Sequence, residues 1–512
     1  MDYATLDRTM DRVAAALQRD GLQPRQAVAI CAGSSVDYMA VFLGALRAGA
    51  VVAPLSPSVT PASFQAMLAD SEAGFLFVDD TAAPLLGERI GEQGGATRLV
   101  ALDAPSRSPR DAAGGGRGLE DFGYSALPLA AWLAADTPPR PVAIQPEWGF
   151  NIIYSSGTTG TPKGIVQPHV MRWIQGNRLS HGYSVESVSL IATPLYSNTT
   201  LVVLLPTLAH GGCVVLMEKF DAAGYLALAE RHRATHTMLV PVQYQRLMAL
   251  PGFDRHDLSS FKLKFCTSAP FPATLKAEVL ARWPGGLVEY YGMTEGGGTC
   301  ILSAHEHPDK LHTVGRPAEG HDIRLIDEEG REVEAGTAGE VVGHSPTMML
   351  GYHRQPGKTR EAEWFDATGK RFIRTGDVGR FDDDGFLVLL DRRKDVIISG
   401  GFNIYPSDLE AVLQSHPRVI EAAVVAAPSA KWGETPVAFV VIEGTVKSER
   451  QGAAAAAKVD DSAVAILQWA NQRLGKTQRL AELHIVAELP RSAIGKVLKR
   501  ELRDRLAGGQ SR

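Results

Sequence analysis

The sequence predicts an α/β protein with a large N-terminal domain of layered sheets and helices, a β-rich subdomain, and a small α+β C-terminal domain. Three observations predict this architecture. Short apolar runs alternate with helical patterns through residue 300, short strands with turn residues begin near residue 314, and a compact mixture of helices and strands follows DRRKD at 391–395. The 512 residues also exceed what one hydrophobic core usually supports.

The first 80 residues begin with an amphipathic helix, since Leu6, Met10, Val13 and Leu17 recur at helical spacing. A strand AVAICAG, a helix across residues 36–49 and a strand VVAPL follow. This alternation is typical of a parallel sheet wrapped by helices. Residues 104–118, APSRSPRDAAGGGRG, have the composition of a surface loop.

A second alternating block, residues 150–300, is expected to form the main α/β core. Its strand candidates are GFNIIY, SLIAT, GGCVVLM, HTMLVP, LKFCTS and LVEYYG. Glu329-Gly330 then predicts a hairpin turn in the β-rich section. The C-terminal part is expected to run helix PSDLEAVLQSH, strands IEAAVVAA and PVAFVVIE, helix VAILQWANQRLG, strand LHIVAEL and helix KVLKRELRDRL. The run QGAAAAAK at 451–458 fits either a loop or the start of a helix.

Composition excludes several classes of function. A net charge of −5 gives no basic field, so we expect no nucleic-acid partner. The N-terminus lacks the pattern of an export signal, and Arg47 or Pro206 interrupts the longest apolar stretches before they could span a bilayer, so no membrane insertion is expected. The four cysteines are scattered without paired spacing, which predicts reduced thiols in a cytoplasmic chain.

The stretch YSSGTTGTPKG, residues 154–164, follows the apolar strand candidate GFNII. Backbone N–H groups in a glycine-rich turn, together with hydroxyls and a lysine, can surround a phosphate. The common nucleotide loop runs from Gly-Lys-Ser/Thr directly into a helix, whereas Lys163 lies between Pro162 and Gly164. This stretch therefore predicts a phosphate-binding loop of a different class.

Three further stretches carry residues suited to nucleotide chemistry. In EYYGMTEGGG, Tyr291 could stack on a base, Thr294 could bond a phosphate, and Glu295 could ligate magnesium. In RTGD, Asp377 suits the hydroxyls of a ribose, while DDDG at 382–385 has the composition of a solvated hairpin turn. Lys496, after Gly495, could be a mobile cation at a reacting phosphoryl group, whereas Lys499 and Arg500 are expected to be surface charges.

Taken in order, YSSGTTGTPKG, YGMTE, TGD, DRRKDVIISGGFNIYPSDLE and PRSAIGK resemble the adenylate-forming superfamily, and most of all its acyl- and aryl-CoA synthetases. The resemblance implies a domain 1–391 that binds ATP and the acid, a mobile lid domain 392–512 that carries Lys496, and a hinge at Lys394. It also implies two half-reactions. An acid attacks the α-phosphorus of Mg-ATP to give acyl-AMP and pyrophosphate, and coenzyme A then takes the acyl group.

The resemblance also implies roles for individual residues. The catalytic residues are Lys496, Glu295 and Thr294, and Glu295 is also the magnesium ligand. Nucleotide and coenzyme A binding fall to Ser155, Ser156, Gly157, Thr158, Thr159, Lys163, Ser268, Ala269, Pro270, Tyr291, Gly292, Asp377, Arg392, Gly400 and Gly401. Two departures stand out: Thr267 and Ser268 occupy places that are usually glycine, and Tyr196 is followed by Ser197 where many relatives have histidine.

The acyl pocket implied by the resemblance is lined by Tyr196, Ser197, Val242, Met293 and Gly296. The sequence shows no evident buried arginine or lysine that would receive a second carboxylate, which favours an aromatic, alicyclic or medium-chain acid over a diacid. Two alternatives stay open: an enzyme that loads a separate carrier protein, and a catalytically inactive nucleotide-binding regulator. A homodimer is also compatible with the sequence.

Overall fold

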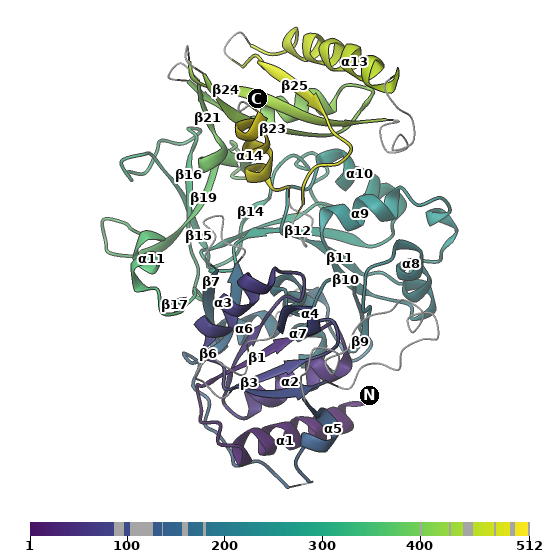
Figure 1. Ribbon diagram of the computed structural model, residues 1–512, viewed down its shortest axis with the longest axis vertical. Coiled ribbons are helices and arrows are strands. Elements are labelled where there is room, and N and C mark those ends of the chain that lie inside the picture. The colour runs from purple at the N-terminus through teal and green to yellow at the C-terminus, as the bar shows by residue number, and fades with distance from the viewer. Residues whose placement is uncertain are drawn as a thin grey trace. The chain divides into compact units, whose positions relative to one another are not determined.

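The computed structural model (Figure 1) describes residues 1–86, 97–102, 126–135, 137–155, 162–177, 181–399, 402–429, 432–443, 454–475, 478–491 and 497–509. The chain divides into two compact units: Met1–Asp322 with Gly343–Ile373, and Ile323–Val342 with Arg374–Arg512. The predicted boundary between domains 1–391 and 392–512 is a hinge for domain movement, which this division does not test, so it stays a prediction. The loop predicted at 104–118 lies outside the described residues.

The first sheet of the N-terminal unit has the strand order β17-β7-β6-β2-β1-β3-β4-β5. Its strands β1 to β6 run parallel, while β7 and β17 are antiparallel additions. These strands are β1 (Ala27–Cys31), β2 (Val51–Pro54), β3 (Phe75–Val78), β4 (Arg98–Ala101), β5 (Leu127–Pro128), β6 (Gly149–Ser155), β7 (Lys163–Pro168) and β17 (Gly351–Tyr352). The associated helices are α1 (Tyr3–Arg19), α2 (Val36–Arg47), α3 (Pro61–Ser71), α4 (Ala83–Leu86) and α5 (Leu129–Trp132).

Local sequence explains where the first helices begin. The side chains of Asp2, Ser35 and Thr60 each accept a hydrogen bond from a backbone N–H in the first turn of α1, α2 and α3. Such side-chain caps satisfy donors that a helix leaves without intrahelical partners. The predicted first helix is confirmed, and Val13 and Leu17 on its apolar face are fully buried.

The second sheet has the order β14-β13-β12-β11-β10-β8-β9. Its strands are β8 (Val188–Ile191), β9 (Cys213–Leu216), β10 (His236–Leu239), β11 (Leu263–Cys266), β12 (Gly286–Gly292), β13 (Thr299–Ser303) and β14 (Arg316–Pro317). The helices are α6 (His169–Gly176), α7 (Asn198–Ala209), α8 (Ala222–Arg231), α9 (Pro241–Met248) and α10 (Ala273–Arg282), with a 3-10 turn at Phe253–Arg255. All six strands predicted between residues 150 and 300 are confirmed.

Helices α2 and α7 join the two sheets into one hydrophobic core. Phe42 of α2, Leu201 and Leu204 of α7, Phe77 of β3 and Phe265 of β11 belong to the same buried cluster. The opposite face of the first sheet packs against α3 and α4. Because α7 lies in this shared core, its position relative to β11 and β12 is fixed by packing.

A third sheet, of order β15-β16-β19-β18 with β20 paired to β19, follows along the chain. It contains β15 (Asp322–Ile326), β16 (Gly339–His344), β18 (Glu363–Phe365), β19 (Arg371–Phe381) and β20 (Leu387–Arg392), and helix α11 (Pro356–Glu361) precedes β18. The predicted turn at Glu329-Gly330 is confirmed, because the N–H of Gly330 bonds to the carbonyl of Asp327 and Gly330 has a φ of +79°.

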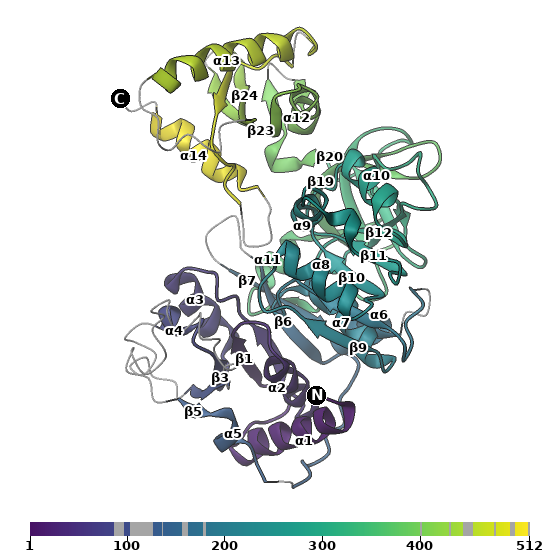
Figure 2. The ribbon, with the colours of Figure 1, turned by 90° about the vertical axis from the view of Figure 1, so that its right-hand side faces the viewer.

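The last sheet carries helices on both faces (Figure 2). Leu409 of α12 and Ile466 of α13 pack on one face of the β23–β24 pair, and Leu502 of α14 packs on the other. The elements are β21 (Ile397–Ser399), β22 (Phe402–Ile404), β23 (Val419–Ser429), β24 (Gly433–Ile442), β25 (Glu482–Ile485), α12 (Pro406–Gln414), α13 (Ala454–Asn471) and α14 (Lys499–Gly509). The alanine run at 451–458 therefore leads into a helix, one of its two predicted readings.

One expectation about cations is wrong. The side chain of Lys499 is 17% exposed and pairs with Glu410, so it is no surface charge; Arg500, at 64%, is exposed as expected. Buried cations also exist in the N-terminal unit: Arg172, Lys264 and Lys276. The partners of Lys264 and Lys276 lie 13 to 37 residues away in the sequence, and Arg172 is bound by the amide side chains of Gln167, Gln175 and Asn198, so single-residue patterns did not indicate burial.

Lys264 and Lys276 are occupied by protein groups. The Nζ of Lys264 donates to the carbonyls of Trp283, Pro284 and Gly285 at 3.1, 2.7 and 2.7 Å. Lys276 pairs with Glu289, and burial raises the pKa of that carboxyl to about 7.

No described helix is long and apolar enough to cross a membrane. All four cysteines are free thiols.

Candidate active site

Predicted site residues follow four strands of the second sheet at the point where each strand ends. Tyr196 and Ser197 come after β8, Val242 after β10, Ser268 after β11, and Met293 after β12. Strands β8, β10, β11 and β12 are parallel neighbours, so these residues lie along one edge of the sheet. Ligands of open α/β sheets bind outside the carboxyl ends of strands, and this edge is therefore the candidate active site.

The predicted phosphate loop joins two antiparallel strands of the first sheet. Ser155 at the end of β6 lies opposite Lys163 at the start of β7. The chain thus returns as a strand, in contrast to the strand-to-helix path of the common nucleotide loop. Ser156, Gly157, Thr158 and Thr159 lie outside the described residues, and their roles stay predictions.

Tyr352 lies between the predicted phosphate lysine and the predicted metal ligand. The Lys163 Nζ lies 5.1 Å from the centroid of the Tyr352 ring, and the Tyr352 hydroxyl donates to Glu295 Oε1 at 2.8 Å. Burial, followed by the nearby Glu295 carboxylate, raises the pKa of Tyr352. The side chain of Tyr352 therefore contacts residues from two motifs that are about 130 positions apart in the sequence.

Tyr352 was not predicted from the sequence, because it lies in a two-residue edge strand without a motif of its own. Strand pairing places it: β17 pairs with β7, with Tyr352 opposite Ile165. Tyr352 also lines an open hollow together with Arg354, Gln355 and Arg360, and the Gln355 Nε2 donates to the carbonyl of Pro162 at 3.5 Å. Basic side chains thus lie beside the end of the phosphate loop.

We expect Tyr352→Phe to slow adenylation by about fivefold to tenfold, because one hydrogen bond to a charged group is worth about 1.5 kcal/mol. The ring remains beside Lys163, so only the orientation of Glu295 is lost. A steady-state titration of magnesium measures this, since a misplaced ligand raises the magnesium concentration for half-maximal rate. An unchanged magnesium dependence with a lowered melting temperature would show a purely structural role.

A buried amide and guanidinium network supports the turn after β12. Gln167 on β7 donates to the carbonyl of Thr294 at 2.6 Å and to the Asn198 side chain at 3.1 Å. Arg172 on α6 donates to Gln167, to Asn198 at 2.6 Å and to Gln175 at 2.7 Å. This network joins β7, α6 and the start of α7 to the Thr294-Glu295 turn.

The backbone conformation of Ser268 explains why glycine is the usual residue at this position of the family. Ser268 has a φ of +82°, in the left-handed region that L side chains rarely adopt. Its hydroxyl lies 2.8 Å from Thr199 Oγ1 in the first turn of α7, and the Thr267 hydroxyl donates to the carbonyl of Tyr290 at 2.8 Å. Ala269 and Pro270 follow before α10. The departure at 267–268 is therefore accommodated by hydrogen bonds.

We expect Ser268→Val to destabilise the protein by about 2 kcal/mol, because a β-branched residue is strained at this φ. Ser268→Gly relieves the strain while losing the bond to Thr199, so its free energy of unfolding stays within about 1 kcal/mol of wild type. Urea denaturation of both variants measures the difference. Equal stability of the two would contradict the strained conformation.

The predicted ribose-binding residues are cross-strand neighbours in the C-terminal unit. Asp377 on β19 lies opposite Arg392 on β20, and Arg392 Nε pairs with Asp377 Oδ1 at 2.6 Å. This ion pair fixes the orientation of the carboxylate. Lys394, in a 3-10 turn at Arg393–Asp395, has its pKa lowered, first of all by burial. Gly400, Gly401 and Lys496 lie outside the described residues, and their roles stay predictions.

The remaining predicted residues line the same edge of the second sheet. Tyr291 lies on β12 beside Tyr290, so their side chains point to opposite faces of the sheet. A Cβ on Gly292 would lie 3.2 Å from Thr299 Oγ1, and Gly296 has a φ of +74° with Met171 and Thr347 close by. Two such constrained positions indicate a tight turn rather than a roomy pocket wall at this point.

A magnesium ion fits Glu295 as a single protein ligand. Its Oε1 accepts from Tyr352, which leaves Oε2 for a cation. No cluster of three or more potential ligands occurs among the described side chains. Magnesium in nucleotide sites keeps waters and binds through one or two carboxylates and the phosphates, so one carboxylate is consistent with this ion.

The fold and these residues define an adenylate-forming ligase. The chain belongs to the AMP-binding enzyme family: the AMP-binding enzyme profile matches residues 1–353, and the profile of the AMP-binding enzyme C-terminal domain matches residues 408–496.

Individual relatives agree with this membership. The chain is 31% identical to fatty acid–[acyl-carrier-protein] ligase ScoC of Streptomyces coeruleorubidus, over 100% of the chain and 93% of the relative. It is 31% identical to indoleacetate–CoA ligase of Aromatoleum aromaticum, over 99% and 93%. The crystal structure of ATP-bound MatB from Rhodopseudomonas palustris superposes with a TM-score of 0.81 at 28% identity, covering 98% of the chain and 93% of MatB.

Proposed function

We propose that the chain joins a carboxylic acid to coenzyme A in two steps, with ATP as the source of energy. The acid first attacks the α-phosphorus of ATP, and pyrophosphate leaves. The thiol of coenzyme A then attacks the acyl carbonyl of acyl-AMP, and AMP leaves. Membership of the family supports the adenylation, and the names of several relatives support coenzyme A as the acceptor.

The observation that carries the proposal is that Tyr352 contacts both Lys163 and Glu295. A cation and a carboxylate from separate motifs lie beside the end of a glycine-rich loop. This arrangement suits a triphosphate whose tail needs positive donors while a metal bridges its oxygens. A structural ion pair would bring the two charges into contact, whereas here an aromatic hydroxyl separates them and leaves both available.

Each residue then has a defined task. Lys163 and the loop donors hold the β- and γ-phosphates, while the carbonyl of Thr294 is kept in place by Gln167. Asp377, oriented by Arg392, accepts from the ribose hydroxyls. Lys496 supplies positive charge at the α-phosphate, where charge develops as the acid attacks. When bound at Glu295, magnesium would neutralise the phosphate oxygens.

The acid is the least determined part of the proposal. Its carboxylate lies near Tyr196, Ser197 and Val242, and its acyl group extends between α7 and the sheet. Two relatives of the chain have names that specify an aryl acid, indoleacetate–CoA ligase and feruloyl-CoA synthase of Amycolatopsis sp, and the name of a third, ScoC, specifies a fatty acid. Magnesium dependence, a cytoplasmic location and a homodimer complete the proposal; gel filtration tests the last.

The experiment that tests the function is ATP–pyrophosphate exchange with a panel of carboxylic acids, followed by addition of coenzyme A. The proposal predicts exchange that depends on the acid and release of AMP that depends on coenzyme A. Exchange without any response to coenzyme A would favour transfer to a carrier protein instead. Absence of exchange with every acid would indicate a nucleotide-binding regulator and refute the proposal.

A further inference from the structure

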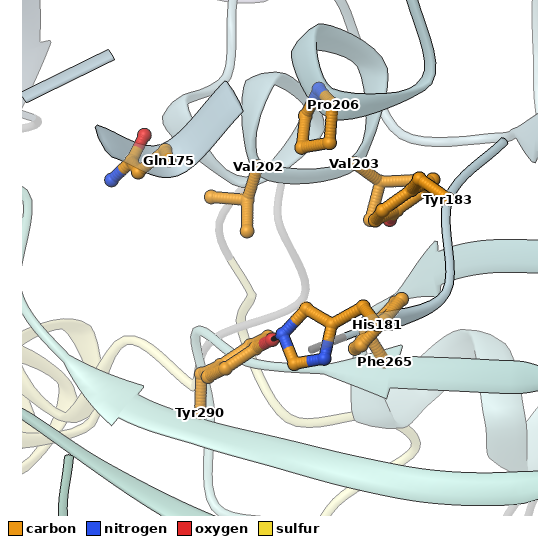
Figure 3. Close-up of a pocket in the computed structure, with 8 residues that line it drawn as sticks. All are labelled: Gln175, His181, Tyr183, Val202, Val203, Pro206, Phe265 and Tyr290. Carbon is orange, nitrogen blue, oxygen red and sulfur yellow. Dashed lines mark hydrogen bonds between the residues drawn. The ribbon is translucent and has the colours of Figure 1, made fainter. Parts of the chain in front are cut away.

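The second sheet has different surroundings on its two faces near the carboxyl ends of β11 and β12. Figure 3 shows Phe265 and Tyr290 on the face that α7 covers, where their rings are stacked with centroids 5.7 Å apart. Side chains alternate along a strand, so the adjacent residues Cys266 and Glu289 point to the other face. Strand pairing places these two directly opposite each other. The second face therefore carries a carboxyl group inside the protein.

Glu289 is paired with a lysine from the helix that follows β11. Lys276 is the fourth residue of α10, and its ammonium pairs with the Glu289 carboxylate. The two side chains are 2% and 5% exposed. The Lys276 Nζ also donates to the carbonyls of Leu311 and Thr313, at 2.8 and 3.0 Å. One buried ammonium thus joins α10, β12 and the segment before β14.

The pair lies at one end of the segment TSAPF, residues 267–271. Phe271 is the last residue of this segment, and the Lys276 Nζ lies 5.8 Å from the centroid of its ring. At the other end, the Thr267 hydroxyl donates to the carbonyl of Tyr290 at 2.8 Å. Both ends of the segment are therefore connected to successive residues of β12, through a side-chain carboxylate at one end and a backbone carbonyl at the other.

These contacts set the distance between two stretches that are predicted to bind the nucleotide. Residues 268–270 lie inside TSAPF, and Tyr291 follows Glu289 by two positions on β12. Tyr291 is predicted to stack on adenine, and residues 268–270 are predicted to lie beside it. A gap of about 1 Å already loses up to about half of a dispersion contact. A flat base therefore binds well only while the two stretches keep their spacing.

Net stabilisation alone does not account for this pair. Removing two charges from water costs free energy, and apolar residues of similar volume often stabilise a buried site equally well. Burial raises the pKa of Glu289 to about 7, and Lys276 opposes that rise. An ammonium and a carboxylate add direction to a contact, since hydrogen bonds need defined distances and angles. The pair is therefore suited to fixing a position.

We propose that Lys276 and Glu289 are positioning residues that set the affinity for the adenine end of ATP, by holding residues 268–270 at a fixed distance from Tyr291. The inference rests on the nucleotide binding that the proposed function requires. Adenine is remote from the phosphorus that reacts, so its contacts are the same in the ground state and in the transition state. Loss of the pair therefore raises the KM for ATP and leaves kcat and the KM for the acid close to wild type.

The test measures ATP–pyrophosphate exchange by Glu289→Gln, which keeps the shape of the side chain and removes its charge. We expect the KM for ATP and the inhibition constant of AMP to rise about fivefold or more, because both ligands carry adenine. The inhibition constant of inorganic tripolyphosphate, which lacks adenine, should stay within about twofold of wild type. A KM for the acid that rises as much as the KM for ATP would contradict the inference.

Glu278→Gln is the matched control. It makes the same chemical change on α10, in a side chain that is 44% exposed and pairs with Arg282 across one helical turn. Exposed ion pairs contribute little, so every kinetic constant of this variant should match wild type. A KM for ATP raised equally in both variants would mean that any charge change on this side of the protein acts on ATP, and it would refute the role of the buried pair.

A double variant separates positioning from folding. Lys276→Met combined with Glu289→Met replaces the pair by apolar side chains of similar volume, so its melting temperature should stay close to that of wild type. Its KM for ATP should still be about fivefold higher, because apolar contacts do not fix the direction of the contact. A wild-type KM for ATP in this variant refutes the inference. If neither this variant nor Glu289→Gln folds, the pair serves folding itself and the inference is refuted as well.

The outcomes also separate the inference from the proposed function. If exchange occurs and the variants keep the wild-type KM for ATP, the ligase remains and only the inference fails. If no acid supports exchange by wild type, the proposed function fails, and titration calorimetry with AMP then decides the inference by itself. Weaker binding of AMP by Glu289→Gln than by wild type would support it. Equal dissociation constants, or no binding of AMP by wild type, would refute it.

Discussion

Replacing Lys496 by alanine lowers the rate of acyl-AMP formation by about a hundredfold or more, while thioester formation from supplied acyl-AMP stays within a few-fold of wild type. The reason is that negative charge grows on the α-phosphate oxygens only when the acid attacks and pyrophosphate leaves. A positioned ammonium stabilises that transition state and has no such task once acyl-AMP exists. Pyrophosphate exchange measures the first step, and release of AMP from synthetic acyl-AMP measures the second.

Arg500→Ala is the matched control for Lys496→Ala. It removes a positive charge four residues further on, from a side chain that is 64% exposed. We expect both half-reactions of this variant to match wild type, because exposed charges contribute little. If Lys496→Ala slowed the two half-reactions equally, the lysine would have a structural role and the assignment would be wrong.

Much of the fold could be predicted because apolar alternation is a local property. Each strand from β8 to β12 is a short apolar run bounded by Gly, Pro or polar residues, and each was placed correctly. At the alanine run the sequence left two readings, a loop or the start of a helix, and only the structure decides for the helix. The order of five motifs likewise indicated the family before any contact between them was known.

Contacts between distant segments could not be predicted, and the missed residues depend on them. Tyr352 reaches Glu295 only because β17 adds to the edge of the first sheet beside β7. Arg172 is buried because three amide side chains, Gln167, Gln175 and Asn198, come together around it. In sequence, each of these is an ordinary polar residue. The polar residues Gln167 and Asn198, within or beside apolar elements, were the available signal.

Replacing Lys499 by methionine should destabilise the C-terminal unit by about 3 to 5 kcal/mol, the typical cost of removing one partner of a buried ion pair. Its Nζ lies 2.8 Å from Glu410 Oε1 and 4.0 Å from Asp391 Oδ1, and the three side chains are 17%, 19% and 7% exposed. Asp391 also accepts from the N–H of Ser407 at 2.9 Å, and Arg503 pairs with Asp395 one turn further along α14. Helix α14, which follows Lys496, thus pairs with Asp391 and Asp395, which lie on either side of Lys394 in the sequence.

The destabilisation by Lys499→Met should depend on pH in a defined direction. Burial raises the pKa of both Glu410 and Asp391, and Lys499 opposes that rise. Without Lys499 the two carboxyls hold their protons more tightly in the folded than in the unfolded chain. The contribution of these groups to stability then falls as the pH rises through their folded pKa values, so the loss is larger at about pH 8 than at about pH 5.

Urea denaturation of wild type, Lys499→Met and Arg500→Met at the two pH values measures this difference. Arg500→Met removes an exposed charge next to Lys499 and should change the free energy of unfolding by less than about 0.5 kcal/mol at either pH. A pH-independent loss in Lys499→Met would mean that packing of the lysine stem, rather than its charge, stabilises the unit.

Because α14 begins three residues after Lys496, the Lys499→Met variant should also slow adenylation more than thioester formation. Equal slowing of both steps would show that α14 positions the whole lid and not the lysine alone.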